Sequence, residues 1–488
     1  MSKRIIVIGG GIAGLSTGCY VLMNGFDVQI FEMHSVPGGL CTAWKKKGYT
    51  IDLCIHWLVG SSPRSSLYRV WEELGVIKGR EFHNYEYCAR AIDERGNEFV
   101  AYTNPDRLEE NMFKLAPEDS KLIERFIQDL RTLSKSNIPF ERPSVKDMLR
   151  MLPVYRLYPK YSMTVQEFAK KFRNPVLRSL FTAALAWHDM SLIFVMMTLA
   201  WMGNGSAGYP MGGSLPVAKS IEERFLRLGG RITYRSKVSK ILVENDRAVG
   251  VRLTDGTEHQ AGIVVSGADG HSTIFEWLDG KYVDDEIRGL YKKLPAFPPL
   301  IFVGLGVAAD FTKEPITTNF PLKNAIRIGN REYRRITLRN HSFDPTLAPA
   351  GKTLLSTMIP ADHDFWTEIG QDRQKYDIEK GRVEEAVIGA LAERYPDIRS
   401  KIETVDVATP LTFVRYTGNW RGSYQGWQFT KDTMRMTIKP TLPGLSNFYM
   451  AGHWVAPGGG LPGAALSARR AVKLLCKNEN IPFNTSTP

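Results

Sequence analysis

The N-terminal segment divides into short hydrophobic runs separated by glycine. Lys3–Ile8 is a β-branched apolar run that predicts a buried strand. The Gly9–Gly14 turn leads into apolar residues at helical spacing that end at Gly25, and a second strand is expected over Asp27–Phe31, directly before Glu32. The order strand, glycine turn, helix, strand is typical of a parallel α/β unit.

Further along the chain, the hydrophobic pattern changes between helical and strand spacing. Residues 71–204 are mostly helical in pattern, whereas Pro298–Thr357 is richer in strand patterns. Asp255-Gly256 lies between the apolar runs Ala248–Leu253 and Gly262–Val265, which predicts a hairpin of these two runs. The chain therefore combines a parallel α/β unit with mixed α and β segments.

The most apolar segment, Ala183–Met202, predicts a single helix rich in methionine and aromatic residues. Flexible methionines and flat aromatic rings can line a tunnel for a long apolar substrate, but such a helix is more often plain core. Both interpretations stay open. His188-Asp189 is the polar interruption of this segment.

The overall composition is that of an ordinary globular protein of two or three domains. The chain has 488 residues, of which 43% are hydrophobic and 23% are charged. This composition excludes general disorder, although the polar segment after Lys477 is predicted to be disordered.

The cysteine pattern and the N-terminus predict a cytoplasmic protein without a metal site. The five cysteines are widely spaced and form no C-x-x-C pair, which disfavours a disulfide framework and a structural zinc site. The N-terminus enters a glycine turn instead of the apolar core of an export signal. The longest apolar stretch, Met190–Gly203, is 14 residues, whereas a spanning helix needs about 20.

The net charge of +12 is concentrated in one segment. The segment from Arg142 to Thr182 contains nine basic residues and only two acidic residues. Aromatic and basic residues mixed in this way suit a lipid headgroup interface, and a solvated surface is the alternative. No nucleic-acid-reading module accompanies the basic segment. The expected membrane-contacting residues are Arg150, Tyr155, Arg156, Leu157, Tyr158 and Lys160.

The first glycine turn predicts a dinucleotide site. Gly9 permits the tight turn, Gly11 allows close approach of a pyrophosphate, and Gly14 allows the helix to pack on the strand. Glu32 lies 18 residues after Gly14, where an acid can accept the ribose hydroxyls. The cofactor-binding residues predicted here are Gly9, Gly11, Ile12, Ala13, Gly14, Glu32 and Met33.

Two further glycine-rich blocks favour FAD over NAD. Gly38-Gly39-Leu40 closely follows Glu32, and a second glycine pair at this place suits a flavin but is unnecessary for NAD. Near the C-terminus, a strand ending at Gly452 precedes another glycine loop and a helix start. The additional cofactor-binding residues predicted from these blocks are Gly38, Gly39, Leu40, Gly452, His453, Gly460, Leu461 and Pro462.

These blocks resemble the phytoene desaturase, carotenoid isomerase and retinol saturase group within the flavin amine oxidase superfamily. Gly208–Ile241 and Ser342–Lys352 resemble the same group, and the matching blocks extend from residue 4 to residue 472. The resemblance implies bound FAD and a backbone contact from Val238 to the adenine. The chain departs from the group at Cys54, where glycine is usual, and at Val455-Ala456-Pro457, where desaturases carry Thr-His-Pro.

The resemblance also implies a division of the chain. We expect an α/β fold with a discontinuous Rossmann-like FAD-binding domain made of residues 1–70, 205–285 and 405–488. Residues 71–204 and 286–404 would form an inserted mixed α+β domain that faces the substrate and a membrane.

The function implied is that of an FAD-dependent oxidoreductase that acts on carbon–carbon bonds of a long apolar isoprenoid or polyene lipid, by desaturation, saturation or cis–trans isomerisation. The candidate catalytic residues are His56, His188 and Asp189. Two alternatives remain: an amine or porphyrinogen oxidase of the same superfamily, and a flavin-binding membrane protein without catalysis. A cavity that reaches the flavin site would favour an enzyme.

Overall fold

A five-stranded parallel sheet forms the centre of one part of the molecule. The computed structural model describes residues 3–140, 144–185, 190–430, 432–433, 436 and 438–488. The strands of this sheet, in spatial order, are β10 (Arg231–Thr233), β2 (Asp27–Phe31), β1 (Arg4–Ile8), β14 (Ile263–Ser266) and β20 (Phe448–Met450). Segments far apart in the sequence therefore meet side by side, as expected for a discontinuous α/β unit.

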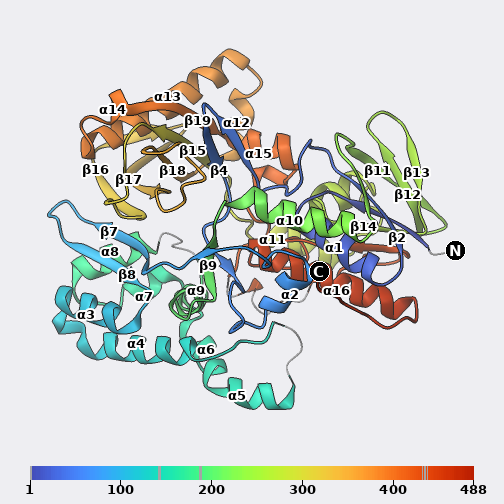
Figure 1. Cartoon of the computed structure of the whole chain (residues 1–488), viewed down its shortest axis with the longest axis horizontal. Helices are drawn as coiled ribbons and strands as arrows, with labels where there is room; N and C mark the ends of the chain where they lie inside the picture. Colours follow the sequence, from blue (N-terminus) through green and yellow to red (C-terminus); the bar gives the residue numbers. More distant parts are fainter. Residues whose placement is uncertain (1–2, 141–143, 186–189, 431, 434–435, 437) are drawn as a thin grey trace.

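Three helices pack around this sheet, at the right of Figure 1. They are α1 (Ile12–Met23), α10 (Ser214–Arg227) and α16 (Gly460–Asn478). Helix α1 is buried from Ile12 to Val21 because it lies between the other two helices. Gly14 has no room for a side chain, since a Cβ atom there would lie 1.8 Å from the Gly9 carbonyl oxygen.

A seven-stranded sheet forms a second part, at the upper left of Figure 1. Adjacent strands of this sheet run antiparallel in every pair except β16 and β7, which run parallel to each other. Its strands, in spatial order, are β19 (Ile402–Ala408), β15 (Leu300–Val307), β18 (Thr353–Pro360), β17 (Arg331–Asn340), β16 (Thr317–Ile328), β7 (Tyr87–Ile92) and β8 (Glu98–Tyr102). The helices that accompany it are α12 (His363–Ile369), α13 (Arg373–Arg394), α14 (Ile398–Lys401) and α15 (Pro410–Thr417).

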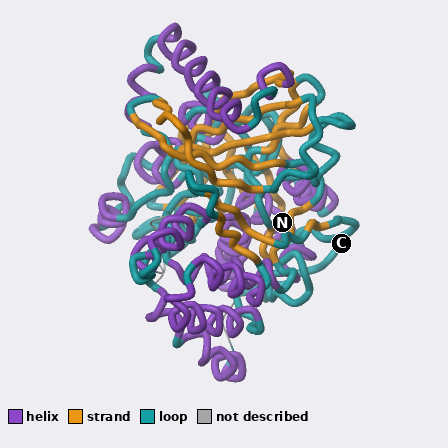
Figure 2. Tube along the Cα trace, turned by 90° about the vertical axis from the view of Figure 1, so that its left-hand side faces the viewer, coloured by secondary structure: helices purple, strands orange, loops and turns teal. Residues whose placement is uncertain are grey.

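The third part is rich in helix, and Figure 2 shows it at the bottom of the molecule, with α13 at the top. Its helices are α3 (Pro105–Leu115), α4 (Ser120–Ser134), α5 (Val145–Tyr155), α6 (Leu157–Tyr161), α7 (Val165–Ala169), α8 (Pro175–Ala184) and α9 (Leu192–Gly203). Most are amphipathic and bury one face in a common core. Helix α9 is apolar all round and lies inside.

Short strands and helices connect these three parts. The strands are β3 (Ala43–Lys46), β4 (Tyr49–Asp52), β5 (Leu58–Val59), β6 (Phe82–His83), β9 (Ala207–Pro210), β11 (Val238–Glu244), β12 (Arg247–Leu253) and β13 (Glu258–Gln260). The helices are α2 (Tyr68–Glu73) and α11 (Asp285–Lys293), with short turns of helix over Pro117–Asp119, Ser272–Glu276 and Trp420–Gly422.

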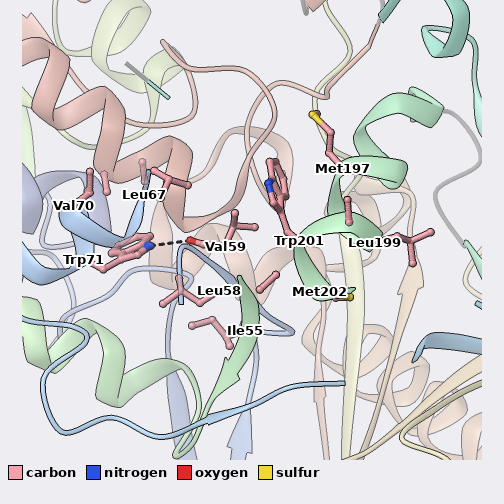
Figure 3. Packing of buried hydrophobic residues seen from close by; sticks show 14 of the residues in the cluster. Ile55, Leu58, Val59, Leu67, Val70, Trp71, Met197, Leu199, Trp201 and Met202 are labelled. Carbon is pink, nitrogen blue, oxygen red and sulfur yellow. Dashed lines mark hydrogen bonds between the residues drawn. The ribbon is translucent and has the colours of Figure 1, made fainter. Parts of the chain in front are cut away.

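The core is continuous between α9 and the strands beside it. In Figure 3, Leu58 and Val59 of β5 lie between Trp71 of α2 and Trp201 of α9. The Trp71 indole donates its hydrogen bond to the Val59 carbonyl at 2.8 Å, so the buried ring is satisfied. This packing holds the helical part against the strands that follow the first glycine blocks.

Three sequence-based expectations are wrong. Asp255-Gly256 does turn the chain, but it joins β12 to β13, while Gly262–Val265 supplies β14 of the parallel sheet. The helix expected over Ala183–Met202 is interrupted, because α8 ends at Ala184 and Ser191 is extended and bridges Thr164.

The third concerns the segment after Lys477, which is packed. Asn484 accepts a hydrogen bond from Asn24 and donates one back, and the Phe483 ring lies 6.0 Å from that of Tyr20. The Lys3 ammonium also pairs with Glu479 at 2.6 Å, and Figure 2 shows both chain ends on one side. Polar composition alone was misleading because these side chains have specific partners.

Candidate functional site

One large cavity lies between the three parts of the molecule. Its volume is about 2230 Å³, whereas pockets for a single small ligand measure about 300–1,000 Å³. It therefore has room for a dinucleotide and a second large molecule. Its wall includes residues of the parallel sheet, the helical part and the seven-stranded sheet.

Almost all predicted cofactor residues line this cavity. Gly14 is the exception, because it is packed against Gly9 in the interior. The lining residues from the predicted set are Gly9, Gly11, Ile12, Ala13, Glu32, Met33, Gly38, Gly39, Leu40, Val238, Gly452, His453, Gly460, Leu461 and Pro462. Residues that are distant in the sequence thus converge on one groove.

The Glu32 carboxylate stands at the end of β2, beside the first glycine turn. It accepts hydrogen bonds from the Gly10 amide at 2.5 Å and from the His34 amide at 2.6 Å. Burial raises the pKa of Glu32, and these amide hydrogen bonds oppose the rise. Each oxygen keeps a second lone pair, so the carboxylate can also accept ribose hydroxyls.

Two helix N-termini face the cavity, and each has glycine as its N-cap residue and no acidic residue in the first turn. Helix α1 begins after Gly11, and α16 begins after Gly459. The first amides of a helix have no partner within the helix, and the helix dipole favours an anion there. Two such ends at one cavity fit the pyrophosphate of a dinucleotide.

The second glycine pair packs directly against the first turn. The Gly38 amide donates to the Gly10 carbonyl at 2.9 Å, and Gly11 and Gly38 form a parallel bridge. Gly38 has φ of 110°, and a Cβ atom there would lie 2.2 Å from the Cys41 carbonyl oxygen. Only glycine fits at position 38, and the backbone consequently borders the cavity.

His453 fixes the C-terminal glycine loop. Its ring is half-buried at the cavity wall, and its Nε2 donates a hydrogen bond to the Gly460 carbonyl at 2.8 Å. Burial lowers the pKa of His453, so the ring is neutral. The Gln425 side-chain oxygen accepts from the Gly460 amide at 2.8 Å. These bonds shape the loop, and Gln425 was not expected from the sequence.

His56 is the candidate catalytic residue that the structure places on the cavity wall. Burial, reinforced by the positive charge of Arg339, lowers its pKa well below the ordinary value, so the imidazole is neutral at pH 7. Its backbone carbonyl accepts from Tyr85 at 3.0 Å and from Arg339 at 3.2 Å. The other two candidates, His188 and Asp189, lie outside the described residues.

Two buried carboxyl groups near the site were not predicted from the sequence. Asp52 accepts from the Ser214 amide at 2.6 Å and from the Ser214 hydroxyl, and burial raises its pKa to about 6. Asp269 lines the cavity and accepts from the amides of Ser272 and Trp420, and burial also raises its pKa to about 6. Asp269 follows β14, and the carboxyl end of a parallel strand is the sequence signal for such a residue.

The methionine-rich helix serves partly as core and partly as cavity wall. Met196 and Met202 are buried away from the cavity, whereas Met197 lines it. The apolar wall on this side consists of Ile138, Phe140, Tyr158, Ala183, Leu185, Met190, Phe194, Val195, Met197, Leu199 and Trp201. The cavity therefore continues from the glycine-lined groove into an apolar arm.

The exposed face of α5 is apolar. Of the eight exposed large hydrophobic residues among those described, five lie on this helix. They are Val145, Met148, Leu149, Leu152 and Tyr155, at the spacing of one helical stripe. Lys146, Arg150 and Arg156 are also exposed.

Three of the expected membrane-contacting residues are engaged elsewhere. Leu157 is buried, and Tyr158 turns inward to line the cavity. Lys160 pairs with Asp129. The burial of Leu157 is contrary to its expected membrane contact, because the helical repeat directs it into the core. Membrane contact of Lys160, whose side chain is 48% exposed, stays a prediction.

In the described part of the chain, no group of three or more His, Cys, Asp or Glu residues could hold a metal ion. Likewise, no described helix is long and apolar enough to cross a membrane.

Comparisons with known proteins agree with this geometry. The sequence model of the family "Flavin containing amine oxidoreductase" matches residues 12–476. The chloroplastic prolycopene isomerase of Daucus carota is 26% identical over 95% of this chain and 78% of its own. A lycopene-forming phytoene desaturase of Paracoccus sp. is 24% identical over 97% of both chains.

The fold is also found among solved structures. Cyclohexylamine oxidase from Brevibacterium oxydans superposes with a TM-score of 0.62 over 98% of this chain and 100% of its own, at 13% identity. The cavity, its paired helix N-termini and the buried Glu32 fit the flavin dinucleotide that this family binds. The chain belongs to the flavin containing amine oxidoreductase family and is an FAD-dependent oxidoreductase.

Proposed function

We propose that the protein acts on carbon–carbon bonds of a long apolar isoprenoid or polyene lipid, by desaturation, saturation or cis–trans isomerisation. The observation that carries this proposal is the continuity of the cavity from the glycine-lined groove into the apolar arm beside α9. The names of the similar prolycopene isomerase and phytoene desaturase support the same substrate class.

The proposed roles of the residues follow from their positions. Gly9, Gly11 and Glu32 would hold the dinucleotide, whose flavin supplies the two-electron chemistry when bound. The apolar arm would orient the chain of the substrate and exclude water from the reacting carbon. The neutral imidazole of His56 can accept a proton or a hydrogen bond at the cavity wall.

Two further parts of the proposal concern arrangement. We keep the expected division into an FAD-binding domain and an inserted substrate domain, because the strands of the parallel sheet come from the segments assigned to the FAD-binding domain.

We also propose that the protein attaches peripherally to an anionic membrane through α5. Its apolar stripe is flanked by cations, and Tyr158, three residues after Tyr155, lines the cavity.

An anaerobic titration of the yellow holoprotein tests the proposed reaction. A substrate that is desaturated should bleach the oxidised flavin, and one that is saturated should reoxidise chemically reduced flavin. Isomerisation should instead change the polyene spectrum without net flavin reduction. We expect one of these responses with polyene or isoprenoid lipids, slowed in His56→Gln and unchanged in His259→Gln, since His259 lies in β13 away from the cavity.

The alternatives predict different outcomes. If the protein is an amine or porphyrinogen oxidase, amines or porphyrinogens should bleach its flavin and polyenes should have no effect on the flavin spectrum. The similarity to cyclohexylamine oxidase, at 13% identity, supports the fold alone. A non-catalytic flavoprotein would give no response to any ligand, and either result would refute the proposal.

A further inference from the structure

One wall of the cavity is polar and cationic, although the opposite wall is apolar. Alternate residues of β17 line the cavity with polar side chains, and Ile336 also borders it. The polar residues are Arg331, Tyr333, Arg335, Thr337 and Arg339. Leu338, on the other face, belongs to the core of the seven-stranded sheet. A cavity made only for a hydrocarbon would not require guanidinium groups on its wall, because cations are costly to keep away from water.

Arg339 is the centre of this wall. It stands opposite Thr317 of β16 and Ser356 of β18, so the three side chains form a row across neighbouring strands. All three residues line the cavity. The Thr317 hydroxyl is buried and has no hydrogen-bond partner in the structure. The Ser356 hydroxyl is hydrogen-bonded to the His341 ring at 2.9 Å, so Arg339 is the member of the row with open donors toward the cavity.

The Arg339 guanidinium is only partly satisfied by the protein. Its Nη2 donates to the Tyr85 hydroxyl at 2.6 Å and to the His56 carbonyl at 3.2 Å. Its Nε is buried and unpartnered. Guanidinium has five N–H donors, so three remain without an acceptor from the described residues: the shielded Nε hydrogen and the two Nη1 hydrogens, which are the ones a ligand can reach.

Asp52 is near enough to Arg339 for the guanidinium charge to oppose the rise that burial causes in the pKa of Asp52, but the two side chains do not pair. Arg339 forms no ion pair within the described chain, and the Asp52 carboxylate is bound instead by Ser214 and Cys54. The acidic residues that line the described cavity wall, Glu32, Asp269 and Glu276, follow strands of the parallel sheet. Beyond the glycine-lined groove, the described wall thus carries cations, neutral polar groups and apolar groups, but no carboxylate.

We propose that Arg339, with Thr317 and Ser356 beside it, forms a carboxylate-binding subsite in the cavity. This inference rests on the proposed function, and it narrows the substrate to an apolar polyene or isoprenoid chain with an anionic end group. A carboxylate would accept charge-assisted hydrogen bonds from the open Nη1 hydrogens, because both two-pronged edges of the guanidinium include Nη2, which already donates to Tyr85 and His56.

Binding of a polyene acid and its ester tests the subsite. The probes are all-trans-retinoic acid, as a representative polyene carboxylate, and its methyl ester, which retains the chain but lacks the charge. Their dissociation constants are measured on the oxidised holoprotein from the perturbation of the flavin spectrum. Wild type should prefer the acid by roughly tenfold or more, as expected for hydrogen bonds to a charged group.

Three variants test whether Arg339 causes the preference for the acid over the ester. Arg339→Met should bind acid and ester equally, and Arg339→Lys should retain part of the preference through its charge. Arg334→Met is the matched control, because Arg334 lies on the same strand but is exposed and does not line the cavity. It should behave as wild type. FAD content is measured for every variant.

Four results would overturn the subsite: equal binding of acid and ester by wild type, no binding of either, a preference that survives in Arg339→Met, or loss of FAD in that variant, which would make Arg339 a flavin-binding residue. The redox response to the same probes is scored separately. A preference for the acid without any redox or isomerisation response would retain the subsite and refute the proposed reaction, whereas turnover without preference would do the reverse.

Discussion

At the residue scale, Glu32 has two tasks that compete for one carboxylate. It accepts the Gly10 and His34 amides, which shape the turn, and it borders the cavity where the ribose would lie. Since charge-assisted hydrogen bonds contribute about 1.5–3 kcal/mol, Glu32→Ala should weaken FAD binding by roughly ten- to a hundredfold. Flavin release during dialysis and titration of the apoprotein would measure the loss.

A control for Glu32 is available on the same strand. Asp27 begins β2 and pairs with Arg231 at the surface, at 2.8 Å. Asp27→Ala should therefore retain its flavin. Unchanged FAD affinity in Glu32→Ala would remove the ribose-binding role and leave the carboxylate as a brace for the glycine turn.

Asp52 supplies a second residue-scale prediction, on the dependence of stability on pH. Burial raises the pKa of Asp52 from 3.8 to about 6, so the folded state binds its proton more tightly than the unfolded state. Its stabilising contribution is therefore complete below about pH 4 and is lost as the pH rises through about 6. Two pKa units correspond to at most about 3 kcal/mol.

The measurement is the difference in Tm between Asp52→Asn and wild type. This difference should shift in favour of the variant as the pH rises from 4 to 7, because asparagine cannot ionise. Asp255→Asn is the comparison, since the hydrogen bond from Thr257 lowers the pKa of the exposed Asp255, and its difference should stay flat between pH 5 and 7. A flat difference for Asp52→Asn would mean that the carboxyl is charged throughout.

At the scale of an element, α5 combines properties that rarely occur together in a free surface helix. Its exposed stripe is apolar, while Met151 and Val154 bury the opposite face. Exposed cations near an anionic surface contribute about 1 kcal/mol each, and the inserted apolar stripe adds a salt-resistant part. We expect flotation with anionic vesicles that salt weakens but does not abolish.

Substitutions on the stripe test this contact. Leu149→Glu with Leu152→Glu should abolish flotation, whereas Leu226→Glu with Ile378→Glu, which changes exposed apolar residues of α10 and α13, should not. Flotation of both double variants would place the membrane face elsewhere. If the α5 variant instead lowers the oligomeric state without affecting flotation, the stripe is a contact between copies of the chain.

The elements also show what the sequence could predict. The first strand, helix α1 and strand β2 follow from hydrophobic spacing and the glycine turn, because each is stabilised by local pattern. The interruption of the helix expected over Ala183–Met202 does not follow from local pattern, because it depends on Ser191 pairing with Thr164 across the helical part. Long-range contacts also explain two other wrong predictions. The sequence did not predict that β12 pairs with β13, nor that the segment after Lys477 packs against Asn24.

The site was predictable to the extent that its residues belong to such motifs. Glycines that must adopt positive φ or allow close approach, such as Gly38, leave a recognisable pattern. Arg339 leaves none, because its significance arises from the missing counter-charge and the row formed with Thr317 and Ser356. Long-range register, not composition, creates that arrangement.

At the scale of the whole molecule, the cavity joins the three parts, and the apolar arm should set how long a substrate can be. Val195 of α9 is partly exposed toward this arm and lines it. Val195→Trp would fill the arm without touching the glycine-lined groove, and extra volume in a confined space is tolerated poorly. FAD content should therefore stay unchanged while turnover of long polyenes falls more than that of short ones.

Rates with a series of polyenes of increasing length would measure this change. Leu226→Trp adds comparable volume on the exposed surface of α10 and should leave the length profile as in wild type. Since the arm and the groove share one cavity, a uniform fall at all lengths accompanied by loss of flavin would mean that Val195 supports the cofactor side. An unaltered profile in Val195→Trp would show that long substrates extend along another wall, beside β17.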